Sequence, residues 1–317
     1  MEIVSSNTND VTIIFKVVLY IIAFIGLCIV VYEYYYKNIE YYGQIIKYAS
    51  IPDYTRWVLS DKYVAKQYAV MHGFKVPETY QLVKYPHQID FNRNSYVIKP
   101  VDLCNSGGVY LIKNHINLKS NKIVNEKNII NELHHLRSMV FNEYYMHDKM
   151  YNGLIPYSGY LIEELLLDET GNIPHDYKCY VFGGKIHYIA MTYNRRVEDG
   201  KQQFDSIWLD REWNPIKITM IKKGYKYKSK VDKPKLYNKM LLLVENMAKK
   251  LKRHCRIDIY MINNDIYLGE YTFFCGAKLH TVYCNFVLGC IWLKNPDNYL
   301  YEDPNIRKIV PSFYNNP

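Results

Sequence analysis

The stretch RIDIYMINNDIYLGEYT, residues 256–272, decides how the rest of the sequence is read. Two runs of mainly apolar residues flank the turn formers Asn263-Asn264-Asp265. Apolar runs separated by a short segment of this kind predict two antiparallel strands joined by a tight turn. The fold therefore contains at least one β-hairpin near its carboxyl end.

Polar side chains interrupt both runs of this hairpin. Because side chains alternate between the two faces of a strand, Arg256 and Asp258 should share one face, and Glu270 and Thr272 one face of the partner strand. Two carboxylates held across a hairpin suit Mg²⁺, which prefers oxygen ligands, and Arg256 could neutralise charge on a phosphoryl group. An ion-pair network with a purely structural role fits the same residues.

A second hairpin is predicted upstream, where a strand ends at Lys99 and a turn contains Ser106-Gly107-Gly108. A glycine turn lets backbone N–H groups approach phosphate oxygens, and a lysine on the strand supplies a fixed positive charge. The pair predicts a phosphate site, although a glycine hairpin beside a lysine also occurs without any ligand.

Two more predicted strands carry charged residues. The run YLIEELL, residues 160–166, contains Glu163 and Glu164, which should point to opposite faces. Asp176 and Lys178 open the next strand and should share a face. A solvated edge strand and a surface ion pair are the alternative interpretations of these two features.

Helical segments are expected between the strands. Ser60 is the expected N-cap of a helix that begins at Asp61 and stops at Gly73. Polar sequence over 125–149 and an amphipathic pattern over 235–252 predict two further helices.

The amino-terminal region predicts a membrane anchor. Residues 11–32 are 22 mainly apolar residues with Lys16 as the single charge, and a bilayer core of roughly 30 Å needs about 20 helical residues. A cleaved signal peptide is the alternative, but acidic residues precede the run and tyrosines follow it. Lys37 and Lys47 follow the run, which predicts a single-pass protein with its carboxyl-terminal body in the cytosol.

The composition agrees with a folded, cytosol-facing body. The chain has 317 residues, 49% of them hydrophobic, which excludes a mostly disordered protein. Lys and Arg number 40 against 31 for Asp and Glu, and the net charge of +9 favours anionic partners. Seven cysteines without a CxxC pair indicate reduced thiols.

Taken in order, the motifs resemble the ATP-grasp superfamily, in its TupA-like branch, which is named for teichuronopeptide biosynthesis. The resemblance rests on SDKY (60–63), VIKP (97–100), SGGV (106–109), IEELL (162–166), IPHDYKCYVFGGKIHYI (173–189) and RIDIYMINNDIYLGEYTF (256–273). It implies an α+β fold in which two α+β lobes, preceded by a short pre-ATP-grasp segment, hold ATP between them. Here one transmembrane helix precedes that fold.

The resemblance also implies a division of the chain. The expected segments are a tail (1–10), the transmembrane helix (11–32), a stalk with the pre-ATP-grasp segment (33–95), the lid lobe (96–166), the carboxyl-terminal lobe with the metal site (167–295) and a tail (296–317).

The nucleotide contacts implied by the resemblance lie in three motifs. Lys99 would contact the ATP phosphates from the lid lobe, and Ser106, Gly107 and Gly108 would form the flexible phosphate loop. The hinge strand, whose backbone meets adenine, would comprise Glu163, Glu164, Leu165 and Leu166.

The catalytic and metal roles implied by the resemblance fall on the carboxyl-terminal lobe. Lys178 would face the phosphates, Arg256 would stabilise the transferred phosphoryl group, and Asp258 and Glu270 would bind Mg²⁺ together with Thr272. Many ATP-grasp enzymes have Asn where Thr272 stands, and the segment 273–278 departs from the proline- and glycine-rich loop of the branch.

The expected function is therefore a membrane-anchored, ATP- and Mg²⁺-dependent carboxylate–amine (or thiol) ligase. It would activate a carboxylate as an acyl phosphate, with a glycan or lipid-linked polymer precursor among the expected substrates. Thr272 and the altered loop motivate an alternative, a non-catalytic nucleotide-binding membrane scaffold. Nucleic acid is a less favoured partner, suggested by the lysine-rich loop at 220–235.

Overall fold

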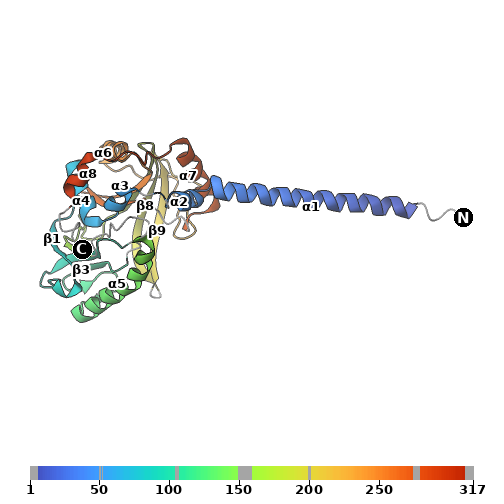
Figure 1. Cartoon of the computed structure of the whole chain (residues 1–317). Helices are drawn as coiled ribbons and strands as arrows, with labels where there is room; N and C mark the ends of the chain where they lie inside the picture. The colour runs from blue at the N-terminus through green and yellow to red at the C-terminus, as the bar shows by residue number, and fades with distance from the viewer. Residues whose placement is uncertain are drawn as a thin grey trace.

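The computed structural model describes residues 6–49, 51, 53–103, 107–148, 159–198, 201–273 and 279–310. Helix α1 (Ser6–Asn38) projects away from a body that contains all the other elements (Figure 1). Its apolar part, Thr12–Tyr35, is long enough and apolar enough to cross a membrane, and none of it is buried against the body. The predicted run at 11–32 thus lies inside one continuous helix.

The body contains two antiparallel sheets. The first has six strands in the order β1-β6-β2-β3-β4-β5. Its strands are β1 (Thr79–Val83), β2 (Ser95–Pro100), β3 (Tyr110–Lys113), β4 (Ile116–Asn117), β5 (Lys122–Ile123) and β6 (Tyr160–Glu163). The predicted hairpin β2–β3 is confirmed, with Ser95 opposite Lys113, and β6 lies between β1 and β2.

The second sheet has five strands in the order β11-β10-β7-β8-β9. They are β7 (Asp176–Phe182), β8 (Lys185–Glu198), β9 (Lys201–Asp210), β10 (Cys255–Ile262) and β11 (Asp265–Thr272). The hairpin across Gly183-Gly184 and the hairpin 256–272 are both confirmed. Strand β9 was not predicted.

Helices cover these sheets and connect them. They are α2 (Tyr41–Ala49), α3 (Tyr54–Leu59), α4 (Lys62–Met71), α5 (Glu126–Asp148), α6 (Tyr237–Leu251), α7 (Val282–Lys294) and α8 (Pro304–Ile309), with a 3-10 turn η1 (Pro86–Gln88). Helices α4, α5 and α6 follow the predicted positions, and α2 and α3 lie in the stalk before Ser60, which was expected to be helical. Helices α7 and α8 were not predicted.

The start of α4 differs by one residue from the prediction. Asp61, not Ser60, is the N-cap, because its carboxylate accepts hydrogen bonds from the backbone N–H groups of Tyr63 and Val64. Ser60 instead ends α3, where its backbone N–H donates to the Arg56 carbonyl. The carboxylate satisfies two N–H groups that would otherwise lack partners at the first turn.

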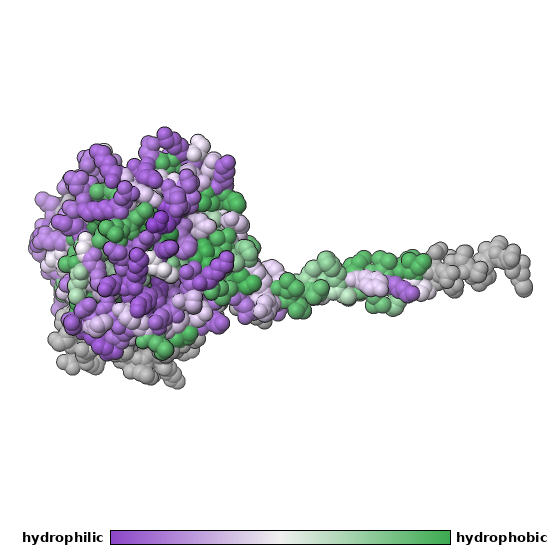
Figure 2. All heavy atoms as spheres, turned by 90° about the horizontal axis from the view of Figure 1, so that it is seen from above, coloured by the Kyte–Doolittle hydropathy of each residue, from purple (hydrophilic) through white to green (hydrophobic). Residues whose placement is uncertain are grey.

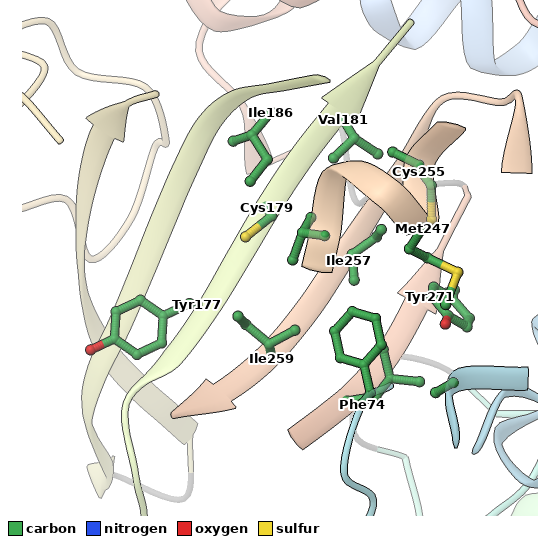
Figure 3. Close-up of a cluster of buried hydrophobic side chains, with 14 of the residues drawn as sticks. Phe74, Tyr177, Cys179, Val181, Ile186, Met247, Cys255, Ile257, Ile259 and Tyr271 are labelled. Carbon is green, nitrogen blue, oxygen red and sulfur yellow. The ribbon is translucent and has the colours of Figure 1, made fainter. Parts of the chain in front are cut away.

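The main core lies between the second sheet and α6. Alternate residues of β10, namely Cys255, Ile257 and Ile259, point into it, and Met247 of α6 lies beside Cys255 (Figure 3). Arg256 and the other residues at even positions of β10 therefore project from the opposite face of the sheet. The packing of one face thus fixes the direction of the polar side chains on the other.

One extended segment joins the two sheets. The backbone of Lys75 exchanges hydrogen bonds with Ile266 and Leu268 at the edge of β11, and the chain then enters β1 of the first sheet. The edge of the second sheet that carries β11 is therefore the edge next to the first sheet. The polar face of the β10–β11 hairpin lies on this side of the body.

Candidate functional site

Asp258 and Glu270 face each other across the β10–β11 hairpin. The register shifts after this pair, because Ile259 pairs with Leu268 and leaves Gly269 as an extra residue in β11. A Cβ on Gly269 would lie 3.1 Å from the Asp258 carbonyl oxygen, so the bulge is tightly packed. The bulge ends the regular ladder beside the two carboxylates, where such irregularities often direct functional side chains.

Arg256 joins the polar residues of the hairpin into one network. Its Nε donates to Oδ1 of Asp258 at 2.6 Å and its Nη2 to Oδ2 at 2.7 Å. The same Nη2 lies 3.1 Å from Oε1 of Glu270 and 3.1 Å from Oγ1 of Thr272. A planar guanidinium suits this arrangement because its N–H groups form a rigid fork.

Lys178 enters the network from the neighbouring strand β7, where it pairs with Asp258. Its Nζ lies 2.7 Å from Oδ2 of Asp258 and 2.6 Å from Oδ2 of Asp176. Arg195 of β8 also binds Asp176, at 2.5 Å. Asp176 and Lys178 share a face as predicted, while the contribution of Arg195 was missed because β8 has a register shift between Tyr193 and Arg196.

The electrostatic state of Asp258 follows from these contacts. Burial acts to raise the pKa of the carboxyl, but the charges and hydrogen bonds of Arg256 and Lys178 outweigh burial and hold it below the usual value. The side chain is therefore ionised at neutral pH. With Asp258 itself the cluster contains three carboxylates and three cations, so it is close to neutral, which lowers the free-energy cost of burying these charges.

The first sheet carries a second charged cluster around Glu163. Lys99 of β2 lies 2.5 Å from Oε1 of Glu163, and Lys66 of α4 lies 2.8 Å from Oε2. Burial acts to raise the pKa of Glu163, but the two ammonium groups lower it below the usual value. Lys99 is thus held by a carboxylate at the end of β6.

The predicted hinge residues lie at and beyond the end of β6. Glu163 is its last residue and is buried, while Glu164, Leu165 and Leu166 continue as an extended, half-buried segment toward the second sheet. The backbone N–H of Glu164 donates to the Glu78 carbonyl at 2.9 Å. The adenine contact assigned to this segment stays a prediction.

The predicted phosphate loop connects β2 and β3. Ser106 lies outside the described residues, and Gly107 and Gly108 form a turn. Gly108 has φ of +66°, and a Cβ there would lie 2.9 Å from Pro100 and 3.0 Å from Leu133. Only glycine suits this position, for its backbone conformation and for its packing.

Lys62, the first residue of α4, connects the two charged clusters and was missed as a site residue. Burial lowers its pKa, the negative charge of Glu270 raises it, and the positive charge of Lys99 lowers it further. Its Nζ donates to the carbonyl of Leu103. Lys62 therefore interacts electrostatically with Glu270 of the second sheet and with Lys99 of the first. Its sequence signal was the SDKY motif.

Four of the residues to which the resemblance assigns site roles form one contact network: Lys178, Arg256, Asp258 and Glu270. Lys99 instead belongs to the cluster around Glu163.

The donor set can be compared with the needs of Mg²⁺. Within the described ranges, no three His, Cys, Asp or Glu side chains form a group suited to a metal. Asp258 and Glu270 nevertheless offer carboxylate oxygens from facing positions, with the Thr272 hydroxyl beside them. This set fits Mg²⁺, which is commonly bound by one or two carboxylates together with phosphate oxygens and water. To bind Mg²⁺, Asp258 would replace some of its hydrogen bonds to Arg256 and Lys178 with bonds to the metal.

Comparisons with known proteins point to one family. The model of the family described as TupA-like ATPgrasp matches residues 44–284, more than half of the chain. No curated protein matches the chain.

Solved structures with similarity to the chain include ATP-grasp proteins. D-alanine–D-alanine ligase from Bacillus anthracis complexed with ATP has a TM-score of 0.44 at 15% identity, covering 84% of this chain and 75% of that one. D-alanine–D-alanine ligase from Helicobacter pylori has a TM-score of 0.37 at 18% identity and covers 74% of this chain, which spans 60% of that ligase. The ATP-grasp RimK domain protein from Sphaerobacter thermophilus has a TM-score of 0.41 at 12% identity, covering 76% and 69%.

Proposed function

The chain belongs to the TupA-like ATP-grasp family, and from that premise we propose that it is an ATP-dependent ligase that joins a carboxylate to an amine or a similar nucleophile. The observation that carries the proposal is the contact network of Arg256 and Lys178 with Asp258 and Glu270. It places two fixed cations beside two carboxylates, which suits the transfer of a phosphoryl group.

The proposed reaction has two steps. An oxygen of the substrate carboxylate attacks the γ-phosphorus of ATP, the bond to the bridging oxygen breaks, and ADP leaves. The amine nitrogen then attacks the acyl carbon, inorganic phosphate leaves with its oxygen, and the amine loses a proton to solvent. One ATP is consumed for each amide bond formed.

The residues of the hairpin would stabilise the negative charge of ATP and of the transferred phosphoryl group. Mg²⁺ bound by Asp258 and Glu270, with Thr272 as a further oxygen donor, would offset the negative charge of the phosphates. Arg256 and Lys178 are held in place by the same carboxylates, so the two cations would meet a phosphoryl group with little loss of side-chain freedom.

The first sheet would supply the remaining nucleotide contacts. Lys99 and the turn containing Gly107 and Gly108 are the proposed phosphate contacts, with Ser106 beside them. The segment Glu163–Leu166 is the proposed adenine contact. Lys62 would join them as a phosphate contact, because it is a cation that interacts electrostatically with both Lys99 and Glu270.

We place the reaction at the cytosolic surface of a membrane. The support is the apolar part of α1, Thr12–Tyr35, and the lysines that follow it. An anchored enzyme meets membrane-bound substrates at a raised effective concentration. A glycan or lipid-linked precursor of a surface polymer is therefore the substrate class we favour.

The experiment uses the full chain in detergent micelles with ATP, Mg²⁺ and pooled carboxylates and amines. The expected result is ADP release that requires both substrates, together with a product whose mass equals their sum minus water. The double variant Asp258→Asn with Glu270→Gln should lose this activity, while Asp265→Asn, on the same hairpin but paired with Lys75 outside the Arg256 network, should keep it. Acceptor-dependent turnover in the double variant would contradict the proposed mechanism.

A nucleotide-binding scaffold without turnover is the second candidate. It is favoured by the engagement of both Asp258 oxygens with Arg256 and by Thr272 at the position where many ATP-grasp enzymes have Asn. ATP binding by the full chain, with no ADP formed for any pair of substrates, would support this candidate over the ligase.

A further inference from the structure

Helix α7 has an apolar surface on both of its sides. Cys284, Leu288 and Trp292 are buried against the body. The other side exposes large apolar side chains to an unusual degree: Val282 is 61% exposed, Tyr283 42%, Phe286 42% and Leu293 47%. A helix that is apolar all round is normally buried on all sides. These four residues define the exposed face of α7, and we expect another surface to shield it from water.

The exposed face of α7 lies beside the point where α1 leaves the body. The rings of Tyr35 and Phe286 are 5.4 Å apart. A Cβ on Gly289 would lie 1.8 Å from the carbonyl oxygen of Ile39, so the backbone after α1 packs directly on α7. Figure 2 shows hydrophobic residues gathered on the side of the body next to α1.

The position of Phe286 along α1 sets its expected depth. Tyr35 is the last residue of the apolar part of α1 that could cross a membrane. Because Phe286 packs on Tyr35, the exposed face of α7 lies level with the end of that apolar part. Tyrosines and other amphipathic rings are enriched at this level of a bilayer.

Exposed lysines lie near the two ends of α7. The backbone of Lys222 donates to the Leu279 carbonyl at 2.8 Å, which places a lysine next to another apolar residue that is 50% exposed. Lys47 at the end of α2 and Lys294 at the end of α7 are also exposed. Lysines around an apolar face suit the anionic headgroups of the cytoplasmic leaflet.

We propose that the exposed face of α7 inserts into the interfacial layer of the bilayer that α1 crosses. This inference rests on the proposed membrane anchor and adds a second contact between the body and the lipid. Two contacts limit the tilt of the body against the bilayer, whereas a single helix would let the body tilt. The hairpin with Asp258 would then stay at a constant height above the membrane.

The test uses the full chain in vesicles of phosphatidylcholine and phosphatidylglycerol. A photoreactive benzophenone analogue of phenylalanine replaces one residue at a time, and the mass of the crosslinked product identifies what it touches. Phe286 and, in a second variant, Val282 probe the exposed face of α7. Cys28 within α1 is the control for the anchor, and Leu242 of α6, which is 66% exposed, is the apolar control away from α1 (Figure 1).

We expect lipid adducts at Cys28, Phe286 and Val282, and no lipid adduct at Leu242. A lipid adduct at Cys28 but at neither position of α7 would overturn the inference and leave the anchor intact. Absence of lipid adducts at Cys28 as well would overturn the anchor itself. A crosslinked dimer at Phe286 or Val282 would assign the exposed face to a second copy of the chain instead of lipid.

Discussion

Asp258 and Glu270 stand opposite each other on adjacent strands, and Arg256 binds both carboxylates at once. Two like charges at facing positions of a sheet would otherwise destabilise the pairing of the strands. The guanidinium therefore has a structural task in addition to the catalytic role that we propose. Substitutions in this network should affect stability and turnover to different extents.

Arg256→Lys should lower the rate of ADP release by about 100-fold, because an ammonium cannot reproduce the fork that joins Asp258, Glu270 and Thr272. The rate at saturating ATP is the measurement. Arg211→Lys is the matched control, since Arg211 also binds a carboxylate through two nitrogens but is 39% exposed. Equal losses in the two variants would contradict a special role for Arg256.

Lys62→Met should weaken ATP binding by about tenfold, which corresponds to 1.4 kcal/mol, with little change in the unfolding temperature. The physical reason is the loss of a cation that interacts electrostatically with both Lys99 and Glu270. Titration of the full chain with ATP measures the effect. Lys75→Met removes an ammonium that is 62% exposed and should leave ATP affinity unchanged; weaker binding in this variant too would point to a general loss of positive charge.

Acid should destabilise the body partly through Glu163. Its pKa is lower in the folded chain than its ordinary value of 4.5, so its ionised form stabilises the fold fully above that pH. This contribution shrinks as the pH falls below 4.5 and is lost through the folded pKa. Urea unfolding at decreasing pH should show a shallower loss for Glu163→Gln than for the unaltered chain, and parallel curves would exclude Glu163 as a contributor.

Gly289→Ala should destabilise the junction of α1 with the body by about 1–3 kcal/mol, because the added methyl group overlaps the Ile39 carbonyl. Thermal unfolding in detergent measures this change. Gly26→Ala is the control, since nothing lies within 4 Å of a Cβ at that position. A neutral Gly289→Ala variant would mean that Ile39 does not pack closely on α7.

The hairpins and the face of each charged residue on them could be predicted from the sequence. Alternation along β10 and the turn after it suffice to place Arg256 and Asp258 together. The partner of Lys99 could not be predicted in this way. Glu163 reaches it only because β6 is inserted between β1 and β2, a pairing between strands distant in the chain.

Helix α7 escaped prediction for a different reason. Its sequence VYCNFVLGCIWLK is apolar on every side, so it lacks the periodic contrast by which an amphipathic helix is recognised. Strand β9 was missed because its pairing with β8 lies on the outer edge of the sheet, where polar residues are tolerated. Lys62 was part of a recognised motif, but its electrostatic interaction with both Glu270 and Lys99 depends on how α4 meets both sheets.

Only Ile39 and Glu40 separate α1 from α2, and the backbone there is pressed against Gly289. A connection of two residues leaves the body little freedom to move relative to α1. A ligase anchored through α1 would therefore select acceptors by the distance of their reacting group from the bilayer surface. A group held on a lipid at the matching distance would reach the hairpin, and a group held closer or farther away would not.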